Sequence, residues 1–202
     1  NGRHAYATSC SSYFIMNIFY LHNEPKTCAQ QHVDKHVVKM IVEYAQLLST
    51  AHRLLDGDLT IGLSKSGRKA KRYVLPDERN DVLYTATHAN HPSAKWTRHS
   101  LANYHWLYNL WVACLDEYTY RYGKVHSCAR LVEHLRFPPT NIPVDVEFSA
   151  PWRAMPDEFK FDRSEEDYTV KSYRAYYNGA KSHMFKWKNR ERPEWVNGAV
   201  QA

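Results

Sequence analysis

The segment that decides the fold runs from Thr27 to Leu55 and reads TCAQQHVDKHVVKMIVEYAQLLSTAHRLL. Thr27 and Gln30 have the spacing of a capping box, in which two side chains bond to free backbone N–H groups at the start of a helix. Apolar residues then recur at helical spacing on one face. The pattern predicts a long helix that ends near Leu55, before Asp56-Gly57-Asp58. Its apolar face consists of Val33, Val37, Ile41, Tyr44, Leu48 and Ala51.

A second long helix is expected from about Ser93 to Tyr122, with Gly123 as its stop signal. Short helices are predicted over 76–89 and 126–136. The face of the second long helix consists of Trp96, Tyr104, Leu107, Trp111, Cys114 and Tyr118.

A final helix is predicted from near Ser164 to about Tyr177. Glu165, Glu166 and Asp167 would occupy its first turn, where the helix dipole favours acidic side chains. The segment after it is basic and aromatic.

Two connecting segments are expected to be irregular. Residues 56–80 are polar and too long for a turn, with the basic run Lys65 to Arg72 at their centre. Residues 138–156 are rich in proline, with one short strand expected at Val144 to Phe148. We find no internal repeat.

These patterns predict a mainly α protein, a single compact helical domain with long irregular loops. The domain would cover residues 16–202, because Met16 opens a compact apolar segment, and residues 1–15 would be an N-terminal extension. The alternative is that Met16 is an ordinary core methionine.

The composition is basic and aromatic. The 202 residues carry a formal net charge of +6, 14% are aromatic and 12 are histidine. A basic surface attracts phosphates, and flat rings can stack on bases, so the composition favours a nucleic-acid partner. The alternative reading is that the charge serves solubility alone.

No apolar run approaches the ~18 residues that span a bilayer, so we expect neither a membrane helix nor a signal peptide. The cysteines are few and none forms a C-x-x-C pair, which favours a reducing, cytoplasmic compartment. Cys28 and Cys114 fall inside helical patterns as packing residues; the other two are Cys10 and Cys128.

His32, His36, Lys39 and Glu43 form one column along the first long helix. Two imidazoles, an amine and a carboxylate can supply a general acid, a base and a nucleophile. A lysine with a lowered pKa can attack a sugar carbon and form a Schiff base. Two alternatives stay open. One is a solvated face with a Lys39–Glu43 ion pair; the other is a metal held by the two histidines, although no His-Glu-x-x-His signature is present.

Nucleic-acid contacts are expected in three further regions. The first is the basic run of the long connection, and the second is the start of the second long helix, where backbone N–H groups also point outward. The third is the basic and aromatic C-terminal region, where rings alternate with phosphate ligands; alternatively, Tyr176 and Tyr177 close the core. With Lys35, the expected contact residues are Lys65, Arg68, Lys69, Lys71, Arg72, Lys95, Arg98, His99, Arg174, Tyr176, Tyr177, Lys181, Lys186, Trp187 and Lys188.

Three short motifs resemble a known family. They are Met16-Asn17-Ile18, Ala29-Gln30-Gln31-His32 and the aromatic run from Tyr173 to Lys181. They resemble the pyrimidine-dimer DNA glycosylases of the endonuclease V type, which are small α-helical repair enzymes of phages and bacteria. The resemblance covers the first and last helices.

The resemblance implies an enzyme that kinks duplex DNA, flips a nucleotide out and excises a damaged pyrimidine. An amine attacks C1′, a Schiff base forms and β-elimination nicks the strand. The family's nucleophile is the amine of the residue after the initiator methionine, and here fifteen residues precede Met16. The family's catalytic glutamate falls at Lys39, and the nearest carboxylate on that face is Glu43.

We therefore expect a DNA glycosylase, with or without lyase activity on abasic sites, whose catalytic residues are Lys39, Glu43, His36 and His32. Its expected partner is double-stranded DNA with a damaged or modified base, and no cofactor or metal is expected. The protein would be a monomer in the cytoplasm of a bacterium or a phage-infected cell. The alternatives are a non-catalytic nucleic-acid-binding protein and a base-modifying enzyme on the same scaffold.

Overall fold

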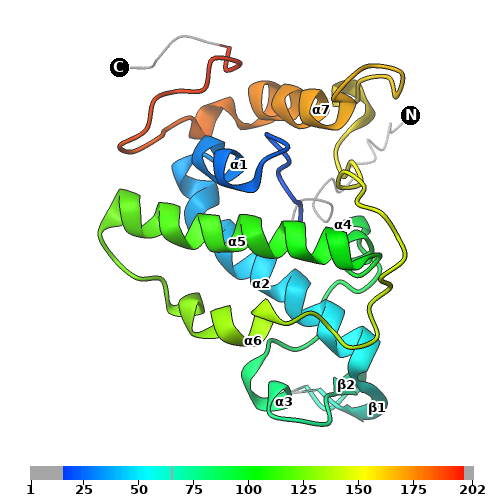
Figure 1. Ribbon diagram of the computed structural model, residues 1–202. Coiled ribbons are helices and arrows are strands. Elements are labelled where there is room, and N and C mark those ends of the chain that lie inside the picture. The colour runs from blue at the N-terminus through cyan, green and yellow to red at the C-terminus, as the bar shows by residue number, and fades with distance from the viewer. Residues whose placement is uncertain (1–15, 65, 198–202) are drawn as a thin grey trace, which may run out of the picture.

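Two long helices that cross at the centre organise the molecule. The computed structural model describes residues 16–64 and 66–197, so the expected N-terminal extension lies outside the described residues. Helix α2 (Asp34–Asp56) descends behind α5 (Leu101–Tyr122), and α1 (Pro25–Gln31) lies above both (Figure 1). The Trp111 indole N–H on α5 donates to the Ile41 carbonyl on α2 at 2.9 Å. The mainly α fold class predicted from the sequence is confirmed.

The predicted first helix is in fact two helices. Glu24, not Thr27, caps α1, because its carboxylate accepts from the backbone N–H groups of Lys26 and Thr27. Pro25 occupies the first turn, where a missing N–H costs nothing. The chain is extended at His32 and Val33, and α2 begins at Asp34. The predicted end near Leu55 is correct to one residue.

The predicted second helix is also divided. The short α4 (Pro92–Thr97) precedes Ser100, whose hydroxyl accepts from the Asn103 N–H and caps α5. The predicted stop is confirmed, because Gly123 adopts a left-handed conformation with φ of 64°. A non-glycine residue is strained in that conformation.

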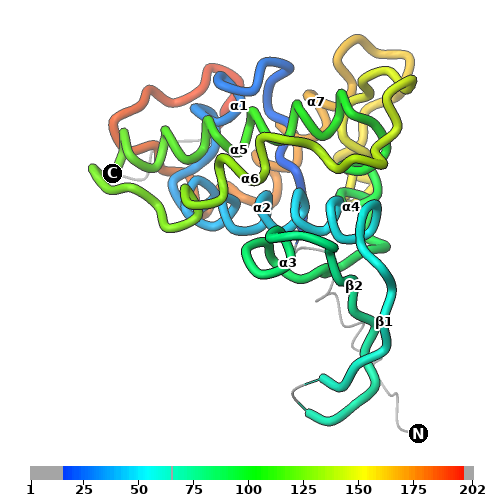
Figure 2. Tube along the Cα trace, turned by 60° about the horizontal axis from the view of Figure 1, so that its bottom comes forward, coloured from blue at the N-terminus to red at the C-terminus, as the bar shows by residue number. Residues whose placement is uncertain are grey.

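The prediction of an irregular connection over 56–80 is wrong. Strands β1 (Asp58–Leu63) and β2 (Lys69–Val74) pair antiparallel, with Leu59 opposite Tyr73 and Leu63 opposite Lys69. Gly67, with φ of 75°, allows the turn between them. This hairpin projects away from the helical body (Figure 2).

The remaining elements are short. Helix α3 (Arg79–Val82) replaces the longer helix predicted over 76–89. A 3₁₀ turn and α6 (Val132–Arg136) confirm the helix predicted over 126–136. The strand predicted at Val144 to Phe148 is absent, because those residues pair with no strand in the described part of the chain.

The last helix starts later than predicted. Helix α7 runs from Tyr168 to Tyr176 and continues as a π-helical turn over Tyr177–Lys181. Glu165 and Glu166 therefore precede the helix, and Asp167 is its N-cap. In Figure 1, α7 and the following C-terminal segment lie beside α1, at the end of the molecule opposite the hairpin.

The core is rich in aromatic side chains and buries both helix-borne cysteines. Trp96, Trp111 and Tyr104 are fully buried between the helices. Cys28 and Cys114 are buried free thiols, as expected for packing residues. This apolar burial is the main favourable term for folding.

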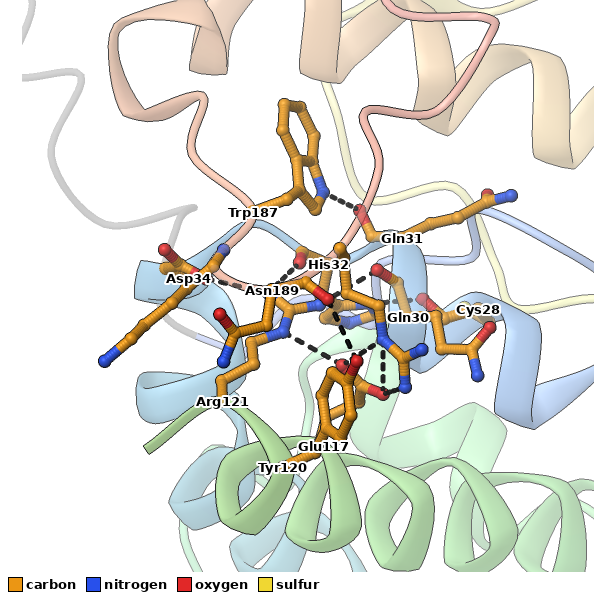
Figure 3. Close-up of polar contacts among 12 residues, drawn as sticks. Cys28, Gln30, Gln31, His32, Asp34, Glu117, Tyr120, Arg121, Trp187 and Asn189 are labelled. Carbon is orange, nitrogen blue, oxygen red and sulfur yellow. Dashed lines mark hydrogen bonds and ion pairs between the residues drawn. The ribbon is translucent and has the colours of Figure 1, made fainter. Parts of the chain in front are cut away.

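A buried arginine near the end of α5 bonds to the chain at the junction between α1 and α2. The Arg121 side chain is fully buried and pairs with Asp34 and Glu117, each at 2.9 Å (Figure 3). It also donates to the carbonyls of Gln30 and His32, which the helix break leaves without helical partners. A buried charge costs free energy unless it is paired and hydrogen-bonded, and here all three charged groups are.

The same cluster ties down the C-terminal segment. Glu117 also accepts from the Arg190 guanidinium, which stacks 4.0 Å from the centre of the Tyr120 ring. The Lys188 N–H donates to Asp34 at 2.9 Å. We call Asp34, Glu117, Arg121 and Arg190 the Arg121 cluster; it holds α2, α5 and the C-terminal segment together.

Replacing Arg121 with methionine should lower the free energy of unfolding by about 3–5 kcal/mol, because Asp34 loses its cation and Glu117 keeps only Arg190. Urea denaturation measures this. The control is Arg136→Met, at a 63% exposed side chain whose partner Glu133 is also exposed. It should cost at most about 1 kcal/mol. Equal losses in the two variants would contradict the role given to Arg121.

Candidate active site

The predicted column on α2 divides into a buried and an exposed part. The Lys39 ammonium lies 3.3 Å from the Glu43 carboxylate, with 58% of the lysine side chain and 9% of the glutamate side chain exposed. His36 and His32 are buried. The helix therefore presents an amine and a carboxylate at its surface edge and keeps both imidazoles inside.

Glu43 is a carboxylate in an unusual environment. Its Oε2 atom is buried and has no hydrogen-bond partner among the described residues. Burial raises the pKa of the Glu43 carboxyl, and the nearby Lys39 charge opposes that rise. A carboxyl group with a raised pKa holds a proton at higher pH and can donate it as a general acid.

A second amine is within electrostatic reach of Lys39. Lys181, which the sequence suggested as a phosphate ligand, ends the π-helical turn after α7, with its ammonium 5.1 Å from the centre of the Tyr176 ring. Burial lowers the pKa of Lys181, and the charge of Lys39 lowers it further. A lysine beside another cation is more often unprotonated and so is a better nucleophile.

The two histidines are held by the core. His36 stacks on Phe19, with ring centroids 4.1 Å apart, and its Nδ1 lies 2.6 Å from the Tyr177 hydroxyl. Burial, aided by His32 and by the charges of Lys181 and Lys39, lowers the pKa of His36 to about 2. The imidazole is therefore neutral and positions its neighbours.

His32 does not fit the predicted catalytic role. Its two ring nitrogens bond to the Cys28 carbonyl at 2.7 Å and to the Tyr44 hydroxyl at 2.8 Å. Burial lowers the pKa of His32 to about 4. With both nitrogens occupied, it can neither exchange a proton with a substrate nor share a metal with His36.

Tyr176 and Tyr177 also differ from the stacking role predicted for them. Tyr177 is fully buried, and Tyr176 is 1% exposed. Their rings pack against Phe19 and the C-terminal aromatic residues, so they close the core, which was the alternative reading. In this structure they have no ring face to offer to a base.

Several predicted phosphate ligands surround the start of α2. Lys35, Lys186 and Lys188 are exposed. The Asp34 N–H donates to the Lys186 carbonyl at 2.8 Å, which fixes the C-terminal segment against this end of the helix. Trp187 is half-buried, and its indole N–H donates to the Gln31 carbonyl. We call Lys39, Glu43 and Lys181 the amine site, and Lys35, Lys186 and Lys188 the lysine-rich surface. The amine site thus lies beside the lysine-rich surface.

The other predicted contacts lie elsewhere. Arg68, Lys69, Lys71 and Arg72 are exposed on the hairpin, and Lys65 lies outside the described residues. Near α4, Lys95 and His99 are exposed. Two predicted phosphate ligands form hydrogen bonds within the protein: Arg98 donates to the Ala89 carbonyl, and Arg174 donates to the Leu21 carbonyl.

A hollow of about 860 Å³ lies between α1 and the C-terminal segment, lined by residues that include Gln30, Arg174 and Trp195. It does not include Lys39 or Glu43. Its lining residues also do not include Lys181. The hollow and the amine site are therefore separate places on the molecule.

In the described ranges 16–64 and 66–197, no group of three or more histidine, cysteine, aspartate or glutamate side chains is placed to hold a metal ion. In the same ranges, no helix is both long and apolar enough to cross a membrane.

Comparisons of the chain with protein-family models, with curated proteins and with solved structures found no match. The function is therefore inferred from the chain's own residues.

The buried histidines should make stability depend on pH. The pKa of histidine in an unfolded chain is about 6.5, whereas burial lowers the pKa of His32 to about 4 and that of His36 to about 2. The unfolded chain therefore binds more protons below pH 6.5, and the free energy of unfolding should fall as the pH drops from 6.5 towards 4.

Replacing His36 with glutamine should reduce that slope by roughly 1.4 kcal/mol per pH unit, the contribution of one proton. Denaturation at several pH values measures it. His105→Gln, which removes an exposed imidazole, is the matched control. A His36→Gln slope equal to the wild type would show that His36 is not held neutral.

Proposed function

We propose that the protein is a DNA glycosylase with lyase activity, which excises a damaged or modified pyrimidine from double-stranded DNA. Two observations carry the proposal: the ion pair of Lys39 with the buried Glu43 on α2, and the hydrogen bond between His36 and Tyr177, which holds the turn that carries Lys181 against that helix. Lys39 and Glu43 come from α2, and Lys181 comes from the turn that follows α7. The lysine-rich surface around the start of α2 supports binding to phosphates.

Lys181 is the proposed nucleophile in place of the Lys39 suggested by the sequence. Burial and the Lys39 charge both lower the pKa of Lys181, whereas Lys39 is more than half exposed and paired with Glu43. Lys39 then acts as a positioning residue: its charge lowers the pKa of Lys181, which favours the unprotonated amine, and can also attract a phosphate.

The chemistry follows from these roles. The lone pair of the Lys181 Nζ attacks C1′, and the bond from C1′ to the base breaks. The departing base keeps the bonding electrons and takes the proton of the Glu43 carboxyl. The amine loses a proton, the sugar ring opens with protonation of O4′, and an iminium links Lys181 to C1′. Loss of a proton from C2′ then expels the 3′ phosphate and nicks the strand.

Two other functions use the same surface. A non-catalytic DNA- or RNA-binding protein needs the lysine-rich surface but not a lowered amine pKa or a buried carboxyl group. A base-modifying enzyme needs a flipped base but no amine at C1′. Both predict that borohydride traps no covalent complex, which separates them from the proposed glycosylase.

Borohydride trapping on a duplex with an abasic site tests the proposal. Lys181→Ala should abolish the trapped complex. Lys39→Ala should weaken trapping at neutral pH and restore it at higher pH, because the pKa of Lys181 rises when its cationic neighbour is removed. Glu43→Gln should slow release of the base from a duplex with a pyrimidine dimer and spare trapping on the abasic duplex.

The matched control is Lys171→Ala, which removes a lysine of α7 that pairs with Glu165 away from the site. It should trap like the wild type. Duplex affinity should change by no more than about tenfold in each variant, since one charge among many contributes roughly 1.4 kcal/mol. Wild-type protein that binds the duplex and yields no trapped complex would contradict lyase chemistry and favour the non-catalytic alternative.

A further inference from the structure

The β1–β2 hairpin has a face of unusual chemistry. Residues directly opposite each other in an antiparallel pair point to the same side of the ribbon. The pairs Leu59 with Tyr73, Ile61 with Lys71, and Leu63 with Lys69 therefore share one face. We call residues 58–64 and 66–74 the arm, and this side its apolar–basic face.

The apolar side chains of that face are open to solvent. Leu59 is 54% exposed, Ile61 72% and Leu63 66%. Isolated exposed apolar residues are ordinary, but three in a row on a projecting ribbon form a patch. An exposed flat strand also invites pairing with other chains, and proteins limit this risk with lysines, which here stand opposite two of the three apolar residues.

The arm is strongly basic. Asp58 is the single acidic residue of the 58–74 sequence, which holds five cationic ones: Lys65, Arg68, Lys69, Lys71 and Arg72. A polyanion therefore complements its charge. On the opposite face, Arg72 crosses the ribbon beside Gly62 and donates to the Leu63 carbonyl at 3.0 Å. A Cβ at residue 62 would lie 3.2 Å from the Arg72 side chain, so the glycine makes room for that crossing.

The base of the arm is fixed to the end of α2. The buried Arg53 donates to the carbonyls of Tyr73, Tyr84 and Leu83. It also bonds to both the side chain and the carbonyl of Asn80, whose side chain accepts from the Leu75 N–H. These bonds set the direction in which the arm leaves the body, so its apolar–basic face has a defined orientation.

The shape and chemistry of that face match a groove of duplex DNA. The major groove is about 12 Å wide, admits a two-stranded β-ribbon, and presents thymine methyl groups to apolar side chains between two walls of phosphate. Six residues per strand at ~3.4 Å each give a ribbon of about 20 Å, roughly the rise of six base pairs.

We propose that the arm enters the major groove of duplex DNA, with Leu59, Ile61 and Leu63 against the base edges and Lys69 and Lys71 on the flanking phosphates. The proposal rests on the proposed function, because it takes the ligand to be the duplex on which the amine site acts. Lys39 and Asp56, the last residue of α2, are separated by most of the length of that helix, roughly 26 Å at 1.5 Å per residue. One rigid helix therefore carries the amine site at one end and the arm at the other.

Binding to an undamaged duplex, measured by fluorescence anisotropy over a salt series, tests the arm. The variant Ile61→Ser/Leu63→Ser should lower the affinity at least about tenfold and leave the salt slope unchanged, because it removes contacts that release no counterions. The variant Lys69→Ala/Lys71→Ala should reduce the slope by about 1.8, which is two phosphates at 0.9 each.

The matched control is Val125→Ser, an apolar side chain that is 76% exposed outside the arm. It should bind like the wild type. Thermal melting should be unchanged in all three variants, since none touches a buried group. Wild-type affinity in Ile61→Ser/Leu63→Ser would overturn the groove contact.

Sedimentation of the free protein adds a second outcome. Self-association that Ile61→Ser/Leu63→Ser removes would show that the apolar face joins two copies of the chain, and would also overturn the proposal. Trapping by the wild type on an abasic duplex is recorded in parallel. If the wild type is trapped and the arm variants bind like the wild type, the proposal for the arm alone is refuted. If binding depends on the arm and no complex is trapped, the glycosylase proposal alone is refuted.

Discussion

The buried guanidinium of Arg121 is the interaction on which the rest of the structure depends. It neutralises Asp34 and Glu117. Because the Arg121 side chain is fully buried, water does not solvate its charge, and these two carboxylates balance it instead. By bonding to the Gln30 and His32 carbonyls, it also satisfies backbone groups that a helix break would otherwise leave unpaired. The break between α1 and α2 can therefore sit inside the protein at little cost.

The break in turn determines where the candidate site lies. Asp34, the first residue of α2, accepts from the Lys188 N–H and donates its own N–H to the Lys186 carbonyl, so the C-terminal segment is held across the start of the helix. The hydrogen bond between His36 and Tyr177 holds the turn that follows α7 against α2, and the charge of Lys39 lowers the pKa of Lys181 on that turn. Neighbouring like charges are unfavourable, and each pKa unit of such a shift corresponds to about 1.4 kcal/mol. Such a cost is common where an amine serves as a nucleophile.

Local signals predicted much of the fold. Gly123 ends α5 as expected because a left-handed residue favours glycine, and the apolar periodicity of α2 identifies its buried face. The break at His32 was not predicted, because Val33 and Val37 are both buried and the apolar periodicity continues across the break. Its cause is Arg121, which is distant in sequence. Glu24-Pro25 is a local N-cap signal that marks the true start of α1.

The hairpin and the candidate site were also only partly predictable from local sequence patterns. Leu59, Ile61 and Leu63 alternate with smaller or polar residues, a strand pattern that the run of lysines and arginines obscured. The Lys39–Glu43 pair was visible as a helical spacing. The effect of Lys39 on Lys181 could not be predicted from the sequence, because it depends on tertiary contacts between segments that are far apart in the chain.

The most direct test of the account is to identify the residue that becomes covalently attached to DNA. After borohydride reduction on an abasic duplex, the protein is digested and the DNA-linked peptide is sequenced by mass spectrometry. The account predicts that the modified residue is Lys181. A modification at Lys39, at an N-terminal amine, or at any other residue would contradict the assignment of the nucleophile.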